Sequence, residues 1–400
     1  MYQYIEKTAA SMEEELCRLR MEFHRCPETA WMETETTKKI ETYLKRLGYE
    51  TVSGKAVSGH DTGVIGTVRL GDGPTVALRF DIDALPVCES ESDTHFPRQH
   101  HFCSQRRGLM HACGHDGHTA IGLGCARLLM QLKDHLSGTI KLIFQPAEEG
   151  ARGAAPIVER GWLNDVDALL SAHIFNRPDT LPDSCNVITG VSDSFATTKS
   201  DVIFHGKASH AAHPEQGRDV IPAMAEIICR LKAEPGPGFI HIGVMNAGSG
   251  RNIIADRGTL NLETRAPSTP RDEALNAYLK QTLDQVTSRC GITYELHVTG
   301  SAPSVESTPS FARQLRDLFA SSVPSLHPSP DMIHFPASED ISHMMNRVKE
   351  NGGIASFMLF PAKLSADLHH SDFDFPMTLL VTGVTAFTSG VYFLLAGTES

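Results

Sequence analysis

The first half of the sequence alternates apolar runs with helical segments, and each run ends in acidic or histidine side chains. The runs at 75–87, 139–145 and 167–175 predict buried strands, and the segment 118–132 predicts a helix between the first two. Strands that alternate with helices predict a largely parallel sheet covered by helices. Such a sheet places functional groups at the carboxyl ends of its strands, which is where the polar clusters of this chain fall.

The order of elements changes between about residues 194 and 300. The predicted elements are a strand at 198–206, a helix at 218–234, strands at 239–246 and 258–266, a helix at 270–290 and a strand at 292–300. This βαββαβ order is typical of a ferredoxin-like unit, which can fold as its own small domain. We therefore predict an α/β fold in which a doubly wound mixed sheet, formed by 1–192 and 302–400, is interrupted by an inserted domain at 193–301.

Two further helices are predicted near the ends of the sequence. Ser11 and Glu14 have the spacing of a capping box, and Met12, Leu16, Leu19 and Phe23 follow on one helical face. The segment 375–397 is apolar over a membrane-spanning length, but Gly, Ser and Thr interrupt it. We predict a buried helix there, with a membrane span as the alternative.

Composition excludes several classes of function. The chain has 36 Lys and Arg against 48 Asp and Glu, and the resulting net charge of −12 argues against nucleic acid or an anionic membrane as the main partner. The nine Cys contain no C-x-x-C pair, and the polar, acidic N-terminal residues lack the apolar core of a signal peptide. We therefore expect reduced thiols in a cytoplasmic protein. The 20 His are clustered, which suggests metal or acid–base chemistry.

The densest cluster is the sequence LMHACGHDGHT. Cys113 and His115 stand two residues apart, beside His111, Asp116 and His118. Thiolate, imidazole and carboxylate together form the ligand set of zinc and other divalent transition metals. The alternative is a buried cysteine beside loop histidines held by backbone hydrogen bonds.

Three further groups add candidate ligands. Glu148 and Glu149 end the second strand, and a hydrolytic metal site needs one acid to hold metal and another to accept a proton from the attacking water. His173 ends the third strand, and His369 and His370 stand together near the far end of the sequence. Taken singly, each has a structural alternative, such as a solvated acidic turn or a core histidine. Together they favour a metal site.

Other catalytic chemistries find less support. The sequence has no G-x-S-x-G nucleophile elbow, no Walker A motif and no G-x-G-x-x-G that opens a helix. Cys113 could be a nucleophile, but its two nearest histidines lie on the same loop rather than opposite it. Metal-dependent chemistry is the better interpretation.

The phrases HRCPE, RFDIDALPV, MHACGHDGHTAIGLG, KLIFQPAEEGARGA and SAHIF resemble the amidohydrolase branch of the M20 metallopeptidase family. The phrases GVMNAGSGRNII, LETRA, SEDISHMM and HHSDFDF resemble the group of that family that acts on aminobenzoyl-glutamate. The resemblance implies a metal-dependent amidohydrolase that cleaves p-aminobenzoyl-glutamate to p-aminobenzoate and glutamate. Hydrolysis of another N-acyl amino acid or a dipeptide is the alternative, and a metal-binding partner subunit with little activity of its own is the non-enzyme alternative.

The same resemblance implies two metal ions, Mn or Zn, in each chain. Their ligands would be Cys113, His115, Glu149, His173 and His369. His370 remains an alternative to His369, because the motif contains both. Glu148 would be the general base, and the carboxylate of Asp83 would orient a ligand.

The inserted domain would act as a lid and dimerisation domain. In the family a His, an Asn and an Arg grip the scissile carbonyl and the substrate carboxylate, and the matching positions are His210, Asn252 and Arg265. A loop histidine and a surface ion pair are the alternatives for His210 and Arg265. We expect a homodimer that binds a small N-acyl amino acid, and a heteromer with a related B subunit is a further possibility. Neither nucleic acid nor a membrane is expected as a partner.

Overall fold

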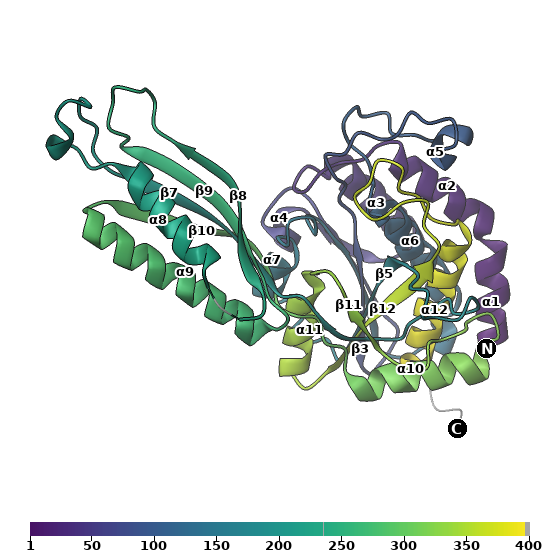
Figure 1. Cartoon of the computed structure of the whole chain (residues 1–400). Helices are drawn as coiled ribbons and strands as arrows, with labels where there is room; N and C mark the ends of the chain where they lie inside the picture. The colour runs from purple at the N-terminus through teal and green to yellow at the C-terminus, as the bar shows by residue number, and fades with distance from the viewer. Residues whose placement is uncertain (235, 397–400) are drawn as a thin grey trace. The chain divides into compact units, whose positions relative to one another are not determined.

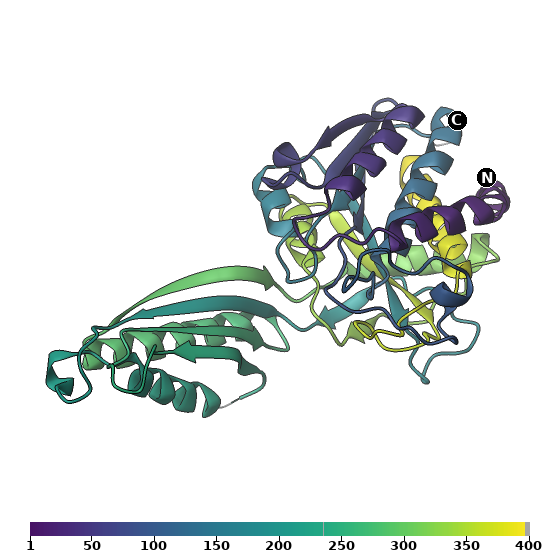
Figure 2. The ribbon, with the colours of Figure 1, turned by 90° about the horizontal axis from the view of Figure 1, so that it is seen from above.

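The computed structural model describes residues 1–234 and 236–396, and the chain divides into two compact units (Figures 1 and 2). The first unit comprises Met1–Ser192, Glu306–His334 and the residues from Asp340 onward, and the inserted unit comprises Asp193–Val305 and Phe335–Glu339. The inserted unit thus extends beyond the predicted range 193–301. The N–H of Phe195 donates to the carbonyl oxygen of Ala337 at 3.0 Å, which joins this second segment to the first.

A six-stranded sheet forms the centre of the first unit, in the order β1-β2-β4-β3-β5-β12. Its strands are β1 (Glu50–Ser53), β2 (Val64–Arg69), β3 (Thr75–Asp81), β4 (Thr139–Gln145), β5 (Ala168–Asn176) and β12 (Ile354–Ala362). The strands β3, β4, β5 and β12 are parallel, whereas β1 and β2 are antiparallel to their neighbours. The predicted mixed sheet is therefore confirmed.

The run at 75–87 contains a shorter strand than predicted, because β3 ends at Asp81. Beyond it, the N–H of Ala84 donates to the carbonyl oxygen of Glu28, and Leu85 pairs with Met110. The chain thus leaves the sheet while it keeps backbone hydrogen bonds to two loops. Those loops surround the carboxyl ends of the parallel strands.

Helices cover both faces of this sheet (Figure 1). One layer contains α1 (Tyr2–Ser11), α2 (Glu13–His24), α3 (Thr34–Leu47), α6 (His115–Gln131), α10 (Pro309–Ser322) and α12 (Thr378–Leu395). The other contains α4 (Lys55–Ser58), α7 (Ala154–Glu159) and α11 (Ile341–Glu350). The short α5 (Phe96–Gln99) lies in the loop between β3 and α6. Phe80 of β3 packs against Phe144 of β4 and Phe387 of α12, which ties the first layer to the sheet.

The predicted capping box is wrong. Ser11 ends α1, and its hydroxyl donates to the carbonyl oxygen of Thr8 at 2.7 Å, so it does not cap α2. The predicted apolar face of α2 is confirmed, because Leu16, Leu19 and Phe23 are all buried.

The apolar segment near the end of the chain forms α12. Among the described residues it is the helix long and apolar enough to cross a membrane, with a mean hydropathy of 1.6 over Thr378–Leu395. It packs inside the first unit, and 67% of that window is buried. The predicted buried helix is confirmed.

The inserted unit has the predicted ferredoxin-like order. Its elements are β7 (Thr197–His205), α8 (Val220–Lys232), β8 (Phe239–Ala247), β9 (Arg257–Arg265), α9 (Thr269–Cys290) and β10 (Thr293–Ala302). The four strands form an antiparallel sheet in the order β10-β7-β9-β8, which leaves β8 at an edge. A two-stranded sheet of β6 (Val191–Ser194) and β11 (Ile333–Phe335) stands where the chain passes between the units.

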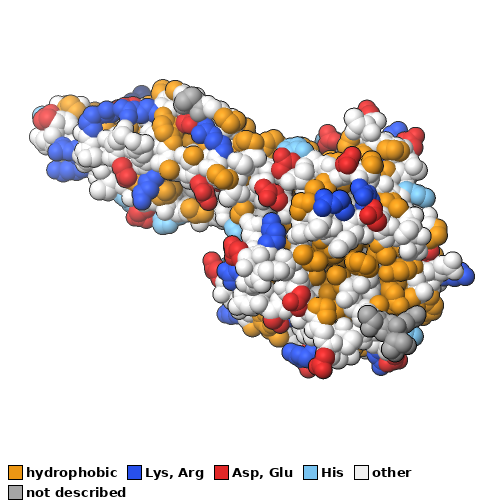
Figure 3. All heavy atoms as spheres, turned by 90° about the horizontal axis from the view of Figure 1, so that it is seen from below, with side chains coloured by type: hydrophobic (Ala, Val, Ile, Leu, Met, Phe, Trp, Pro, Cys, Tyr) orange, Lys and Arg blue, Asp and Glu red, His pale blue; other side chains and the backbone are white. Residues whose placement is uncertain are grey.

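Acidic and basic side chains are interspersed among apolar ones on the face drawn in Figure 3. Charges of both signs are thus mixed on this face, which shows no field of one sign.

Candidate metal centre

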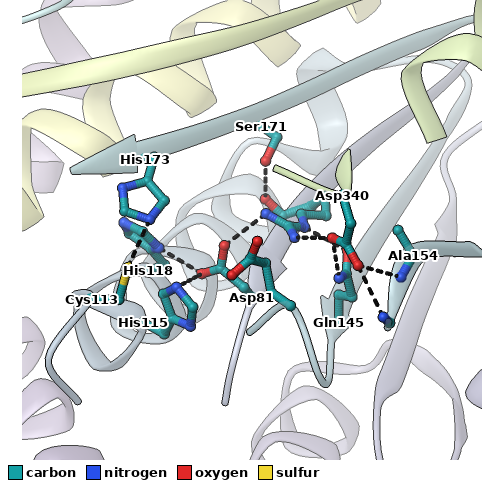
Figure 4. A network of polar contacts seen from close by, with 12 residues as sticks. Asp81, Cys113, His115, His118, Gln145, Ala154, Ser171, His173 and Asp340 are labelled. Atoms are coloured by element: carbon teal, nitrogen blue, oxygen red, sulfur yellow. Dashed lines mark hydrogen bonds and ion pairs between the residues drawn. The ribbon is translucent and has the colours of Figure 1, made fainter. Parts of the chain in front are cut away.

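The first two candidate ligands stand where the chain enters α6. Gly114 precedes the helix with a φ of 89°, a conformation that glycine adopts at no steric cost. This turn directs Cys113 toward β5, where its Sγ lies 3.4 Å from Nε2 of His173 (Figure 4). Both side chains are buried. The cluster therefore forms at the carboxyl ends of the parallel strands, as the sequence predicted.

His115 directs one ring nitrogen into the cluster. Its Nδ1 lies 2.9 Å from the backbone carbonyl oxygen of Asp83, and since a carbonyl can only accept, Nδ1 donates. Its Nε2 is buried and has no hydrogen-bond partner among the described residues. A buried polar atom without a partner costs free energy, and a cation bound at Nε2 would remove that cost.

The histidines His173 and His118 have different surroundings. The Nδ1 of His173 donates to the backbone carbonyl oxygen of Ile174, which leaves Nε2 facing Cys113. In His118 both ring nitrogens are used, because Nδ1 lies 2.6 Å from Asp81 and Nε2 accepts the N–H of Ile174. The Nε2 of His173 therefore faces the cluster, whereas the two ring nitrogens of His118 bind β3 and β5.

The loop after β4 brings in the two glutamates. The carboxylate of Asp83 accepts the backbone N–H groups of Glu148 at 3.0 Å and Glu149 at 2.9 Å. Ala147 and Ala151 flank the pair with φ angles of 54° and 57°, which are rare for residues with a Cβ. This turn directs both acidic side chains toward the cluster, and Asp83 fixes the loop through its backbone.

The structure separates the two adjacent C-terminal histidines. The Nε2 of His369 lies 3.4 Å from Oε1 of Glu149, and its backbone N–H donates to Ala112 beside Cys113. The ring of His370 instead accepts the N–H of Asp372 at 3.1 Å. Of the two candidates, His369 is the one that reaches the cluster.

The predicted ligands and the predicted base converge. The ligand atoms of three overlapping groups lie within 4.8 Å of one another: Cys113 with His115 and His173, Cys113 with Glu149 and His369, and His115 with Glu148 and Glu149. Sulfur, imidazole nitrogen and carboxylate oxygen in this combination suit zinc and neighbouring divalent ions. The residues therefore fit a metal centre.

Electrostatics also favours a cation in the cluster. Burial opposes a charge on His115, but Asp81, Asp83 and Glu149 outweigh it and raise the pKa of His115 to about 10. Burial lowers the pKa of His173 to about 3, so this ring is neutral and can ligate. The side chains thus stabilise a positive charge, whether a proton or a metal carries it.

A buried network behind the cluster escaped the sequence analysis. The guanidinium of Arg79 binds Asp81 at 2.7 Å and Asp340 at 3.1 Å, and Asp340 also accepts the amide of Gln145 at 2.7 Å (Figure 4). Asp340 further accepts the backbone N–H groups of Gly153 and Ala154. The network therefore joins β3, β4 and the start of α7 beneath the glutamate loop. The charged alternation RFDID in an apolar strand was the signal available in the sequence.

The three remaining candidates lie in the inserted unit. His210 pairs with Ile253 in a β-bridge, and Asn252 accepts the N–H of Ala211, so His210 and Asn252 are neighbours. Asn252 stands before the start of β9, whereas Arg265 ends that strand. At ~3.3 Å per residue, the strand separates them by roughly 27 Å. The structure therefore does not bring Asn252 and Arg265 to one carboxylate within a single chain.

The chain is similar to known proteins over most of its length. The profile of peptidase family M20/M25/M40 matches residues 77–391. The chain is 36% identical to an indole-3-acetyl-aspartic acid hydrolase of Enterobacter agglomerans, over 92% of this chain and 93% of that protein. It is 34% identical to one of the subunits of the p-aminobenzoyl-glutamate hydrolase of Escherichia coli, over 94% of each.

Solved structures give the same result. An aminobenzoyl-glutamate utilization protein of Klebsiella pneumoniae superposes with a TM-score of 0.80 at 30% identity, over 97% of both chains. A dinuclear metal-binding M20 peptidase of Bacillus subtilis superposes with a TM-score of 0.72 at 28% identity, over 96% of this chain and 99% of that one.

Fold, site and relatives together define a metal-dependent hydrolase of amide bonds. The chain belongs to peptidase family M20/M25/M40.

Proposed function

We propose that this chain hydrolyses the amide bond of N-acyl amino acids, with p-aminobenzoyl-glutamate as the preferred substrate. The observation that carries the proposal is that the carboxylate of Glu148 lies within 4.8 Å of the ligand atoms of His115 and Glu149, each of which is also grouped with Cys113. The indole-3-acetyl-aspartic acid and p-aminobenzoyl-glutamate hydrolases act on an acyl group joined to aspartate or glutamate, which supports an acidic amino acid as the leaving part.

Two divalent ions, Mn or Zn, would be held by Cys113, His115, Glu149, His173 and His369. When bound, such ions supply Lewis-acid polarisation of the amide carbonyl and lower the pKa of a water molecule. Glu148 accepts the proton of the attacking water and passes it to the amide nitrogen as the amine leaves. The glutamate is 9% exposed, so its carboxylate works in a site from which bulk water is largely excluded.

Arg265 would bind the carboxylate of the substrate's amino acid. Its guanidinium bonds Glu263 at 3.0 Å and Ser338 at 2.9 Å, which holds the side chain in one orientation. A guanidinium has five N–H donors, so donors remain for a substrate carboxylate. Glu263 and Ser338 are therefore positioning groups for this anchor.

His210 and Asn252 would act from a second copy of the chain. The strand β9 separates His210 and Asn252, which would bind the scissile carbonyl, from Arg265, which would bind the carboxylate. If all three side chains contact one substrate, the first two therefore come from a different copy than Arg265. The edge strand β8 carries exposed Phe239, Val244 and Met245, which supports a pairing surface in the inserted unit. This arrangement makes the enzyme a homodimer.

Mixing two inactive variants tests this arrangement. Cys113→Ala and His210→Ala chains, each inactive alone, should regain activity when they are mixed and form a heterodimer, because one composite site is then intact. Sedimentation should find a dimer under the assay conditions. An active monomer, or no recovery in a mixture shown to contain heterodimer, would contradict the proposal.

A second candidate substrate is an aromatic acyl-aspartate, because the indole-3-acetyl-aspartic acid hydrolase is 36% identical to this chain. The alternatives are hydrolysis of other N-acyl amino acids or of dipeptides, and a role as a partner of a related B subunit. The purified chain, loaded with Mn or Zn, should be assayed against p-aminobenzoyl-glutamate, acyl-aspartates and a panel of acyl-amino acids. No hydrolysis of any of them would overturn the proposed function. We place the enzyme in the cytoplasm.

A further inference from the structure

Trp31 has a backbone conformation that bulky residues rarely adopt. Its φ is 69°, and the described non-glycine residues with positive φ are Trp31, His101, Ala147, Ala151 and His369. Three of these, Ala147, Ala151 and His369, stand beside or within the metal centre. A left-handed conformation costs roughly 1–2 kcal/mol for a residue with a Cβ, and such strain gathers at functional sites. Trp31 therefore shares an unusual backbone conformation with residues of the metal centre.

This loop is fastened to both sides of the metal centre. Before Trp31, the carbonyl oxygen of Glu28 accepts the N–H of Ala84, the residue that follows Asp83. After it, Oε1 of Glu33 accepts the N–H of Ala147 at 2.8 Å, the residue that precedes Glu148. A short segment thus carries the indole. One end of this segment is hydrogen-bonded to the backbone beside Asp83, and the other end to the backbone beside Glu148, the proposed base.

The indole ring stacks on His60. The ring centroids are 3.8 Å apart and the rings are inclined by 22°. His60 lies just before β2, whose first residue, Val64, pairs with Phe144 at the carboxyl end of β4. Both rings therefore belong to loops at the same edge of the sheet as Glu148 and Glu149. Stacking holds the indole in one orientation.

The residue after Trp31 is also unusual. Met32 is 64% exposed, the largest exposed fraction among the exposed large hydrophobic side chains that are described. A flexible thioether next to an immobilised indole makes a surface that suits an aromatic ring, since sulfur and aromatic groups attract each other. This surface is formed entirely by the first unit.

We propose that Trp31, held by His60 and flanked by Met32, binds the acyl group of the substrate and selects aromatic acyl groups over small aliphatic ones. The proposal rests on the function proposed above and extends it to the substrate's acyl side. An aromatic acyl ring would stack against the indole while the amide carbonyl enters the metal centre. Trp31 is thus a specificity-determining residue.

The first test compares two substrates that differ only in the acyl group, N-benzoylglutamate and N-acetylglutamate. Trp31→Ala should raise the KM for the benzoyl substrate by about tenfold, the usual worth of an aromatic contact, with kcat little changed. The KM for the acetyl substrate should change less than about twofold. Trp31→Phe should keep most of the preference, and Trp162→Phe, at the chain's other tryptophan, should leave it unchanged.

Equal losses for both substrates, or none, would overturn the assignment of Trp31 while hydrolysis by the wild-type chain still supported the proposed function. Binding can be followed without turnover. With only two tryptophans in the chain, Trp162→Phe leaves Trp31 as the sole indole emitter. N-benzoylglutamate should protect that emission from quenching by acrylamide, and N-acetylglutamate should not.

Protection in a chain that hydrolyses neither compound, nor any other member of the substrate panel, would support the acyl site and overturn the hydrolase. Absence of protection in a chain that hydrolyses both compounds would overturn the acyl site and support the hydrolase. The two proposals therefore fail separately.

Discussion

His369 and Glu149 meet across 220 residues of sequence, with Nε2 of the histidine 3.4 Å from Oε1 of the glutamate. His370, the next residue, points to Asp372 instead. Of these two neighbouring histidines, only His369 thus contacts a proposed metal ligand. The two positions are therefore a matched pair for testing the metal centre.

His369→Ala should lower the metal content, because the chain loses one nitrogen ligand. His370→Ala should keep the metal, since its ring is committed to a turn. Elemental analysis of both variants after purification in limiting Mn or Zn measures the difference. Loss of metal from His370→Ala alone would reverse the assignment.

Glu148→Gln should keep both metals but lower kcat by roughly 10²–10⁴, because the amide cannot accept the proton of the attacking water. Glu149→Gln should lose metal first and recover activity in part at high metal concentration. The measurements are metal stoichiometry and kcat for each variant. If Glu148→Gln loses metal while Glu149→Gln keeps it, the two roles are exchanged.

Arg265→Ala should cost about 2–5 kcal/mol in kcat/KM for substrates with a free carboxylate, because the guanidinium that would bind this carboxylate is removed. A substrate amidated at that carboxylate should lose much less. Arg257→Ala is the matched control, since Arg257 is exposed at the opposite end of β9. Equal losses for charged and amidated substrates would mean that Arg265 serves the fold.

Asp340→Ala should destabilise the chain by about 3–5 kcal/mol, because Arg79 then stays buried with one carboxylate partner fewer. Asp340→Asn should cost less, since it keeps one oxygen acceptor. Asp134→Ala, at an exposed aspartate, should change stability by less than about 0.5 kcal/mol. Urea unfolding monitored by circular dichroism gives the three values, and an unchanged midpoint for Asp340→Ala would show that the network is dispensable.

Stability should decline at both extremes of pH through His24 and Glu89, whose side chains lie 3.0 Å apart. Burial opposes a charge on His24, but hydrogen bonds to Asp116 and Glu89 raise its pKa from 6.5 to about 9. The resulting stabilisation is complete below about pH 6.5 and is lost as pH rises through 9. At ~1.4 kcal/mol per pKa unit, it amounts to roughly 3 kcal/mol.

Glu89 behaves in the opposite sense. Burial raises its pKa, but hydrogen bonds from His24 and His95 outweigh burial and lower it from 4.5 to about 2. Its stabilisation is therefore complete above pH 4.5 and is lost as pH falls toward 2. Thermal unfolding from pH 3 to 10 should show both declines in the wild type, with the alkaline one smaller in His24→Asn. A wild-type Tm that is flat between pH 7 and 9.5 would contradict the predicted alkaline decline through His24.

The sequence predicted what depends on local patterns. The runs at 139–145 and 167–175 are strands because nearly continuous apolar stretches suit a sheet buried on both faces. The ferredoxin-like order was readable because turns separate its six elements. Local spacing misled at Ser11, where a helix ends rather than begins.

What the sequence could not supply are partnerships between distant residues. Arg79 and Asp340 are 261 positions apart, and no local pattern pairs them. Trp31 gave no signal, since a positive φ at a tryptophan is a property of the folded loop.

The inserted unit interrupts the first unit in the sequence, and this determines the order in which a growing chain can fold. The segment that forms β12 is synthesised after all of Asp193–Val305, so the ferredoxin-like insertion can complete its own core first. Until β12 emerges, β5 has no partner along the side that will bind Ile354–Ala362, and its row of backbone donors and acceptors is open to other chains. Ribosome-bound intermediates that stop before residue 354 should therefore depend on chaperones, and the chain escapes this hazard only when its last strand docks.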